Sequence, residues 1–497
     1  MSRQTAVNFA LALATGVMLV LLYPRFGYTF LAPFALAPLL VALAREQRWI
    51  PRFLLGYLAG VVFWAGVCYW IEGTLDQYAN MGTALAMLAF ALFAILKALH
   101  FGLFGLLAAV LIRKPLAALT VAALWTAIER TNGPFGFAWL TLGDAGTSMS
   151  MPMRLAPITG VYGLSFLFAL MATVIALAAL RRPRREWLWI ALVAVLPLLP
   201  ALPASVRGSE RALLVQPNVP EDTDWSLASV HSTVESLADM SLKAAQASGA
   251  QLIVWPEAPL PLYFYRDTGS AMMVATLARA AHVPVLFGTV GEAPGGGPTN
   301  SAILLDQFGN VAGRYDKNFL VPFGEYVPPF FRWVNRVTQE AGDFVPGRGY
   351  PVFGEQGHKL GVFICYESAF PYLVRRFPAA GAQALVNVSN DGYFGTSAAR
   401  QQHLKLVRMR AAENARWILR ATNDGLTTVV DPAGRVHGIA KSFERSAWLV
   451  GFNWQNGTTF FTHHPEWFPI ACALIAALGF VPWRRIDVSK QARAHQS

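Results

Sequence analysis

The chain has few charged residues and few cysteines. Only 14% of its 497 residues are charged and 55% are hydrophobic, whereas soluble globular domains carry about 25% charged residues. This scarcity of charge excludes a protein that is soluble over its whole length. The three cysteines are Cys68, Cys365 and Cys472, and Cys365 alone lies outside a long apolar run. A disulfide framework is therefore excluded, and we expect Cys365 to be a free thiol.

Long hydrophobic runs account for the low share of charged residues. A stretch of roughly 17 to 25 apolar residues spans a bilayer as a helix, and on this criterion the sequence predicts eight transmembrane helices. We interpret the first as a retained anchor, because further spans begin directly after it and no clear small-residue cleavage site follows. The predicted spans lie near residues 6–22, 27–44, 53–71, 83–112, 115–130, 155–180, 187–204 and 467–483.

The positive charge gathers in alternate connections between these runs. The formal net charge is +11, and the basic connections account for it because they contain few acids. Lys and Arg concentrate in cytoplasmic loops, so both termini are predicted to be cytoplasmic and the segment after residue 204 periplasmic. The charge indicates membrane orientation, and no nucleic-acid partner is expected. The basic residues are Arg3, Arg45, Arg48, Arg52, Arg113, Lys114, Arg181, Arg182, Arg184, Arg185, Arg484, Arg485, Lys490 and Arg493.

Residues 207–456 differ from the rest of the chain and predict a soluble α/β domain. Short β-rich runs alternate there with helical patterns and with turns of Pro, Gly, Asn and Asp, which is typical of a layered α/β architecture. The predicted organisation is a seven-helix transmembrane domain over 1–206, the soluble domain over 207–456, and an eighth transmembrane helix with a cytoplasmic tail over 457–497. Predicted strands cover 212–216, 251–255, 283–289, 302–306, 359–365, 384–388, 417–421, 426–430 and 448–452, and predicted helices cover 226–248, 269–281, 371–379 and 398–415.

Three chemically distinct side chains each end an apolar, strand-like run in this domain. Glu257 closes a Trp-Pro-Glu run, Lys317 closes a Tyr-Asp-Lys run, and Cys365 opens a Cys-Tyr-Glu run. Open α/β sheets bind ligands at the carboxyl ends of their strands, so we expect the three to converge. An ordinary thiol is mostly protonated near neutral pH and needs a base. Glu257 suits that role, while Lys317 and the backbone N–H after Cys365 suit stabilisation of an oxyanion.

The roles of several other residues stay open at this stage. Taken singly, a cysteine ending a strand is more often core filler, and a glutamate or lysine is more often a surface charge. Glu325 and Glu367 either orient Lys317 or are simply paired ions. No metal is expected, because the sequence has no clustered set of ligands with metal-site spacing. The aromatic-rich segment 319–350 is either core or a loop whose apolar tip gates lipid entry, in which case Phe330 and Phe331 contact the substrate.

These motifs in combination resemble the nitrilase, or carbon-nitrogen hydrolase, superfamily, and with the flanking spans they resemble the apolipoprotein N-acyltransferase family. A Leu-Val-Pro-Phe-Gly-Glu-Tyr run at 320–326 and a Val-Ser-Asn-Asp run at 388–391 complete the pattern, which covers nearly the full chain. One departure is Gly392-Tyr393, where the family often has Ala-Trp. The resemblance implies an αββα sandwich inserted between the seventh and eighth transmembrane helices, with a Glu257-Lys317-Cys365 triad. It also implies supporting roles for Trp225, Asn300, Glu325, Tyr366 and Glu367, of which Trp225 and Asn300 would contact the substrate.

The resemblance further implies a reaction and its setting. The expected activity is ping-pong transfer of an acyl chain from a phospholipid, usually phosphatidylethanolamine, through a thioester on Cys365. The expected acceptor is the α-amine of the N-terminal diacylglyceryl-cysteine of a lipoprotein, at a bacterial inner membrane and without a cofactor. One alternative is a membrane-tethered amidase or nitrilase with water as acceptor. A second is a non-catalytic lipid-binding scaffold or transporter, which is disfavoured because the spans lack the paired charges of an ion pathway.

Overall fold

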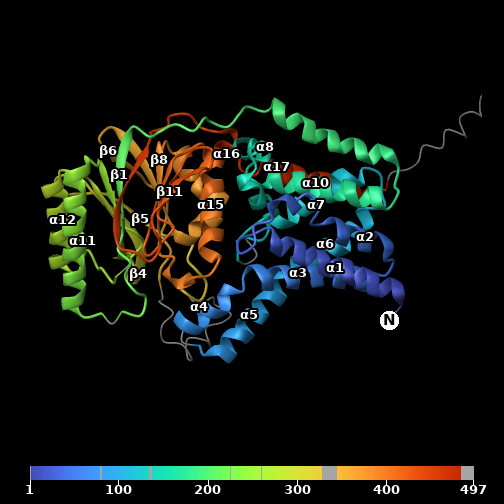
Figure 1. Ribbon diagram of the computed structural model, residues 1–497, viewed down its shortest axis with the longest axis horizontal. Helices are drawn as coiled ribbons and strands as arrows, with labels where there is room; N and C mark the ends of the chain where they lie inside the picture. The colour runs from blue at the N-terminus through green and yellow to red at the C-terminus, as the bar shows by residue number, and fades with distance from the viewer. Residues whose placement is uncertain are drawn as a thin grey trace, which may run out of the picture.

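The computed structural model describes residues 2–78, 81–133, 137–223, 225–258, 260–326 and 344–482. A bundle of apolar helices and a two-sheet domain lie side by side, and the helix α15 lies between them (Figure 1). The main helices of the bundle are α1 Arg3–Leu21, α2 Ala37–Arg45, α3 Trp49–Val67, α4 Trp70–Tyr78, α5 Thr83–Lys97, α6 Leu99–Leu111, α7 Ala117–Arg130, α10 Val161–Ala179, the 3-10 helix η3 Arg184–Leu198 and α17 Trp467–Phe480.

Four helical stretches among the described residues are long and apolar enough to cross a membrane. They are Arg3–Leu21, Trp49–Val67, Thr83–Leu111 and Val161–Ala179. The other four predicted spans form the shorter elements α2, α7, η3 and α17. A helix of 14 residues, such as α7, rises only about 21 Å, which is less than the roughly 30 Å of a hydrocarbon core. The count of eight spans and their orientation therefore stay predictions.

Glycines permit a close helix contact in the bundle, between α3 and α6. A Cβ atom added to Gly56 would lie 2.2 Å from the carbonyl oxygen of Phe101, and one added to Gly105 would lie 2.6 Å from that of Arg52. Both neighbours are backbone atoms, which cannot move aside as a side-chain end can. Small residues at such positions let apolar helices pack closely where no hydrophobic effect drives their association.

The soluble domain contains two six-stranded sheets. The strand order is β12-β1-β2-β3-β4-β5 in the first sheet and β11-β10-β9-β8-β7-β6 in the second. The central trios β1-β2-β3 and β7-β8-β9 are parallel, and the outer pairings are antiparallel. The strands are β1 Glu210–Gln216, β2 Leu252–Val254, β3 Val285–Glu292, β4 Pro298–Leu305, β5 Val311–Asp316, β6 Val352–Glu355, β7 His358–Ile364, β8 Ala384–Ser389, β9 Ile418–Thr422, β10 Thr428–Val430, β11 Val436–Ile439 and β12 Ser446–Phe452.

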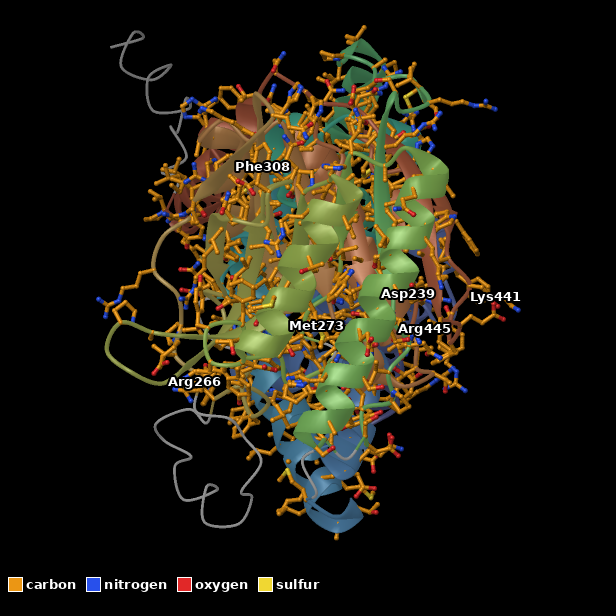
Figure 2. The ribbon with its side chains drawn as sticks, turned by 90° about the vertical axis from the view of Figure 1, so that its left-hand side faces the viewer. Asp239, Arg266, Met273, Phe308, Lys441 and Arg445 are labelled. Atoms are coloured by element: carbon orange, nitrogen blue, oxygen red, sulfur yellow. The ribbon has the colours of Figure 1, made fainter. Side chains whose placement is uncertain are left out.

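Helices cover the outer face of each sheet, which gives the predicted αββα order of layers (Figure 1). The helices α11 Leu227–Ser248 and α12 Thr268–Ala281 cover the first sheet. Figure 2 looks onto this face, where Asp239 of α11 and Met273 of α12 are labelled. Alternation along β1 explains the layering, because Leu213 packs beneath these helices and Leu214 packs in the other core cluster, which includes strands of the second sheet.

Helix α15, Ala399–Asn414, is polar along its length and yet almost wholly buried. A helix that is polar all round is stable inside a protein only when its polar groups find partners. Gln402 shows how this happens, since its amide donates to the backbone carbonyls of Pro24 at 2.8 Å and Val67 at 3.1 Å. Both acceptors belong to the helical bundle, so α15 fixes the sandwich against it.

Most predicted strands and helices are present, and the differences lie at the edges. Strands β5, β6 and β11 were not predicted, because each is an outer strand, and in β5 and β11 exposed or half-buried residues break the apolar pattern. The predicted helix 371–379 is instead two single turns, α13 Pro371–Val374 and α14 Arg376–Ala379. A proline within each short helix limits its extension.

Candidate active site

Each of the three predicted reactive side chains follows a strand. Glu257 comes three residues after β2, Lys317 comes directly after β5, and Cys365 comes directly after β7. β2 and β5 belong to the first sheet and β7 to the second, so the site lies where the two sheets face each other. Cys365 adopts a left-handed backbone conformation with φ of +49°. This conformation is strained for a residue with a Cβ atom, and such strain is concentrated at functional sites.

Lys317 forms a buried ion pair with two carboxylates. Its Nζ lies 3.0 Å from Glu257 Oε1 and 2.9 Å from Glu325 Oε1, and its side chain is 1% exposed. Burial acts to lower the pKa of Lys317, but the charges of Glu257, Glu325 and Cys365 raise it well above its ordinary value. Lys317 therefore stays a cation at neutral pH. It can stabilise negative charge but cannot accept a proton.

Two asparagines hold Glu257 in place. The Asn300 amide donates to Glu257 Oε1 at 2.7 Å and to Glu325 Oε1 at 2.6 Å. The backbone N–H of Asn390 donates to Glu257 Oε2 at 2.8 Å. With Lys317, Glu257 thus accepts three hydrogen bonds, whereas a carboxylate has about four lone-pair sites. One site is left to accept a proton from a neighbouring group.

The Cys365 side chain is held as a neutral thiol. Burial raises the pKa of Cys365 above its ordinary value, the charge of Glu257 raises it further, and the charge of Lys317 opposes the rise. The sulfur is therefore within electrostatic reach of both charged members of the predicted triad. Because the thiolate is the nucleophile and the resting form is the thiol, this cysteine needs a base during attack. Glu257, whose charge acts on the thiol, has one lone-pair site free to serve as that base.

Glu367 ties the lysine segment to the cysteine segment. Its Oε2 accepts a hydrogen bond from the backbone N–H of Ile364 at 2.7 Å, directly before Cys365. Its Oε1 accepts from the Tyr315 hydroxyl and from the backbone N–H of Asn318, each at 2.7 Å. Burial raises the pKa of Glu367 to about 7, and the hydrogen bonds from Ile364 and Tyr315 limit that rise.

Tyr366 points from the site toward the helical bundle. Its hydroxyl accepts a hydrogen bond from the backbone N–H of Ala138 at 3.0 Å, and its ring stacks on Phe137 with centroids 5.2 Å apart. Both partners lie between α7 and α10, in the N-terminal half of the chain. The residue next to Cys365 is thus packed against the part of the chain that contains the apolar spans.

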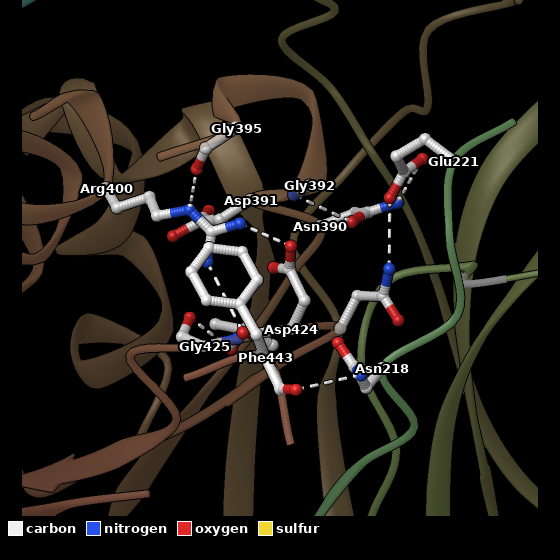
Figure 3. Close-up of polar contacts among 12 residues, drawn as sticks. Asn218, Glu221, Asn390, Asp391, Gly392, Gly395, Arg400, Asp424, Gly425 and Phe443 are labelled. Atoms are coloured by element: carbon white, nitrogen blue, oxygen red, sulfur yellow. Dashed lines mark hydrogen bonds and ion pairs between the residues drawn. The ribbon is translucent and has the colours of Figure 1, made fainter. Parts of the chain in front are cut away.

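A second carboxyl group beside the site was not predicted. The Asn390 amide donates to Glu221 Oε2 at 3.1 Å, and the Asn423 amide donates to Glu221 Oε1 at 3.0 Å (Figure 3). Burial raises the pKa of Glu221 to about 7, and the negative charges of Asp424 and Glu257 add to the rise. Asn390 therefore links two carboxyl groups, through its backbone to Glu257 and through its side chain to Glu221.

The remaining predicted residues have different outcomes. Trp225 packs against the apolar core beneath α11 and α12, and its predicted substrate contact stays a prediction. Phe330 and Phe331 lie outside the described residues, so the predicted gating loop also stays a prediction. Among the residues that the structure describes, no group of three His, Cys, Asp or Glu side chains is arranged to hold a metal ion.

Comparisons with known proteins define the class of this chain. Residues 211–449 match the carbon-nitrogen hydrolase family, and residues 15–174 match the apolipoprotein N-acyltransferase N-terminal domain. The chain is therefore a carbon-nitrogen hydrolase domain joined to a second, N-terminal domain of a defined type. A solved amidase of the nitrilase superfamily from Nesterenkonia is 24% identical with a TM-score of 0.39, over 50% of this chain and 92% of the amidase.

Two full-length relatives identify the particular family. The apolipoprotein N-acyltransferase of Geobacter metallireducens is 31% identical over 95% of this chain and 95% of the relative. The apolipoprotein N-acyltransferase of Methylococcus capsulatus is 34% identical over 97% of this chain and 98% of the relative. The chain belongs to the apolipoprotein N-acyltransferase family.

Proposed function

We propose that this protein N-acylates lipoproteins through a thioester on Cys365. The donor is a phospholipid, for which phosphatidylethanolamine is our first candidate, and the acceptor is the α-amine of an N-terminal diacylglyceryl-cysteine. The observation that carries the proposal is the arrangement of Cys365, held as a thiol, beside the free lone pair of Glu257 and the permanent cation of Lys317. Each of the three has a different role, and none can replace another.

In the first half-reaction, Glu257 takes the proton of the Cys365 thiol as sulfur attacks the ester carbonyl of the phospholipid. The carbonyl oxygen becomes an oxyanion, which Lys317 and the backbone N–H of Tyr366 stabilise; each such donor contributes on the order of 3 kcal/mol. When the tetrahedral intermediate collapses, the C–O bond breaks and the lysophospholipid oxygen takes the proton from Glu257. A thioester on Cys365 remains.

In the second half-reaction, the α-amine of the acceptor attacks the thioester carbonyl. Glu257 removes a proton from the attacking nitrogen, the C–S bond breaks, and the proton returns to sulfur. The chain thus regenerates its thiol, as a ping-pong sequence requires. The side-chain amide oxygen of Asn300, Oδ1, is buried and has no hydrogen-bond partner among the described residues, so it is placed to accept a hydrogen bond from the incoming amine.

The setting of the site supports acyl transfer over hydrolysis. Tyr366 packs against Phe137 of the N-terminal half, so the site adjoins the region with four apolar helices. A thioester beside a lipid surface is shielded from bulk water until the amine arrives. We propose that the site lies on the periplasmic side of a bacterial inner membrane, with both termini in the cytoplasm. The full-length relatives favour this reaction over that of a membrane-tethered amidase.

The test is mass spectrometry of a diacylated lipopeptide incubated with purified full-length protein and phosphatidylethanolamine. The wild type should add one acyl chain to the peptide, and Cys365→Ala should add none. Cys472→Ala is the matched control, because Cys472 is a second buried free cysteine far along the chain in α17, and it should acylate as the wild type does. Acylation that survives Cys365→Ala would refute the mechanism. Release of free fatty acid without peptide acylation would show a hydrolase instead.

A further inference from the structure

A buried histidine lies directly behind the nucleophile. His403 of α15 places its Nε2 atom 3.0 Å from the backbone carbonyl oxygen of Cys365 and its Nδ1 atom 2.9 Å from Asp391 Oδ1. The side chains of His403 and Asp391 are both 0% exposed. His403 contacts Cys365 through its backbone carbonyl, and the acyl-transfer steps described above do not use it.

The partners of His403 fix the orientation of its ring. The Asp391 carboxylate accepts from Arg420 Nη2 at 2.5 Å, and although burial alone would raise the pKa of Asp391, Arg420 and His403 hold it well below its usual value. Asp391 is therefore an acceptor only. Arg420 also lies 3.3 Å from His403 Nδ1. With Nδ1 facing Asp391 and Arg420, the Nε2 atom is turned to the Cys365 carbonyl, to which it is placed to donate.

The carbonyl that His403 contacts belongs to the same peptide as a reacting group. The C=O of Cys365 and the N–H of Tyr366 are the two ends of one amide, and that N–H is the backbone donor assigned to the oxyanion. A hydrogen-bond donor at the carbonyl draws electron density through the amide and makes its N–H a stronger donor. The same bond helps to hold the left-handed conformation of Cys365, whose φ is +49°.

We propose that His403, braced by Asp391 and Arg420, is a positioning residue that polarises the Cys365–Tyr366 peptide and strengthens its N–H toward the oxyanion. The inference rests on the proposed thioester chemistry. Stability alone does not account for this cluster, because a buried ion pair is often no more stabilising than apolar residues of the same size. Its links to the site are the Cys365 carbonyl and the Ser389 hydroxyl, which lies 2.8 Å from Asp391 Oδ1, and the carbonyl is where a donor acts on the peptide that carries the oxyanion N–H.

The proposal predicts a loss of rate without a loss of binding. Both half-reactions pass through an oxyanion, so His403→Leu should lower the kcat of thioester formation and of aminolysis by about tenfold each, with KM unchanged. His403→Gln keeps a neutral donor toward the carbonyl and should lose about threefold. The matched control is His437→Gln, which breaks another His–Asp contact, to Asp431 at 2.9 Å, away from the cysteine, and should leave both rates unchanged.

Nuclear magnetic resonance measures the Cys365–Tyr366 peptide directly, and its signal would not change if His403 had only a structural role. Cys68–Tyr69 and Cys365–Tyr366 are the two Cys–Tyr peptides of the sequence. Labelling cysteine with ¹³C at the carbonyl and tyrosine with ¹⁵N therefore gives two cross-peaks, and the first is an internal control. His403→Gln should shift the Cys365–Tyr366 peak and leave the other in place.

The outcomes separate this inference from the proposed function. If His403→Leu does not accumulate as folded protein, His403→Gln decides the question with both measurements. An unshifted Cys365–Tyr366 peak, or a kcat equal to that of the wild type in folded His403→Gln, would overturn the role of His403. If the wild type forms no thioester, the proposed function fails, and the peak shift still reports whether His403 polarises the peptide.

Discussion

The Tyr315 hydroxyl donates to Glu367 Oε1 at 2.7 Å, and this bond joins the two sheets at the site. Tyr315 lies on β5, two residues before Lys317, and Glu367 lies two residues after Cys365. The ammonium and the thiol come from different sheets, so their separation depends on contacts of this kind. Glu367 is therefore a brace between segments, which answers the question that its sequence position left open.

Tyr315→Phe should weaken this brace without creating a cavity in the core. The ring stays, but Glu367 loses one hydrogen bond inside the protein, and a bond to a charged group contributes about 1.5 to 3 kcal/mol. We expect a lower thermal unfolding midpoint and slower thioester formation, because Lys317 is held less firmly against Cys365. Tyr350→Phe is the control, since Tyr350 is also an aromatic neighbour of Phe377 but, among the described residues, its hydroxyl donates no hydrogen bond to Glu367. Equal rates for Tyr315→Phe and wild type would show that the brace is dispensable.

Variants of the Lys317 ion pair can distinguish the contribution of Lys317 to folding from its contribution to catalysis. Lys317→Met leaves Glu257 and Glu325 as neighbouring buried carboxylates without a cation, which destabilises a protein by about 3 to 5 kcal/mol. Adding Glu325→Gln removes one of the two charges and should restore much of the unfolding midpoint, but no thioester should form, because the oxyanion still lacks its cation. Lys441→Met is the control, since Lys441 pairs with Glu444 on the surface, where such pairs contribute little. A double variant that recovers activity would mean that Lys317 has only a structural role.

The pKa of Glu221 gives a pH dependence of stability. Burial raises it from 4.5 to about 7 in the folded protein, so between these values the unfolded chain has lost the proton while the folded chain keeps it. The folded state then binds more protons, and its stability falls as the pH rises from 4.5 to 7, by on the order of 3 kcal/mol. Glu221→Gln should reduce that slope by the contribution of one carboxyl group, measured as the thermal midpoint at pH 5 and pH 8, while Glu367, whose pKa is also raised to about 7, keeps its own contribution. Glu235→Gln, at an exposed position of α11, should leave the slope unchanged, and an unchanged slope in Glu221→Gln would contradict the assignment.

The sequence singles out the residues of the proposed triad more clearly than the residues that contact them. Glu257, Lys317 and Cys365 each follow an apolar run, and a polar residue after such a run stands out against the pattern. His403 and Arg420 lack that signal, because their importance comes from partners distant in the chain. In α15 the polar residues are buried on more than one side, so the periodicity that separates a core face from a solvent face is absent there.

Prediction from the sequence has a similar limit in the region of the apolar helices. Hydropathy correctly places apolar helices near the N-terminus, since Arg3–Leu21 and Trp49–Val67 are long enough to span. It does not fix where a helix breaks. The predicted run 83–112 is divided into α5 and α6 at Ala98, and the predicted run 27–44 contains the short helix α2. Composition is the same on both sides of such breaks, so only packing reveals them.

A glycine behind Glu257, the proposed base, offers the last test. Gly288 of β3 lies so close to the loop of Glu257 that an added Cβ atom would be 2.4 Å from the nitrogen of Ala258 and 2.5 Å from the oxygen of Pro256. These are backbone atoms, and Gly288 also donates its N–H to that Pro256 oxygen at 3.1 Å. Gly288→Ala must therefore push Glu257 out of place.

We expect Gly288→Ala to lower thioester formation by about a hundredfold, because a displacement of roughly 1 Å at a reacting group has an effect of that size. The fold should survive, since overpacking of one methyl group costs about 1 to 3 kcal/mol. The matched control is Gly354→Ala on β6, where an added Cβ atom meets nothing within 4 Å. Rapid alkylation of Cys365 in a folded Gly288→Ala protein that forms no thioester would locate the defect at the base. A Gly288→Ala protein with wild-type rates would show that the position of Glu257 does not limit the reaction.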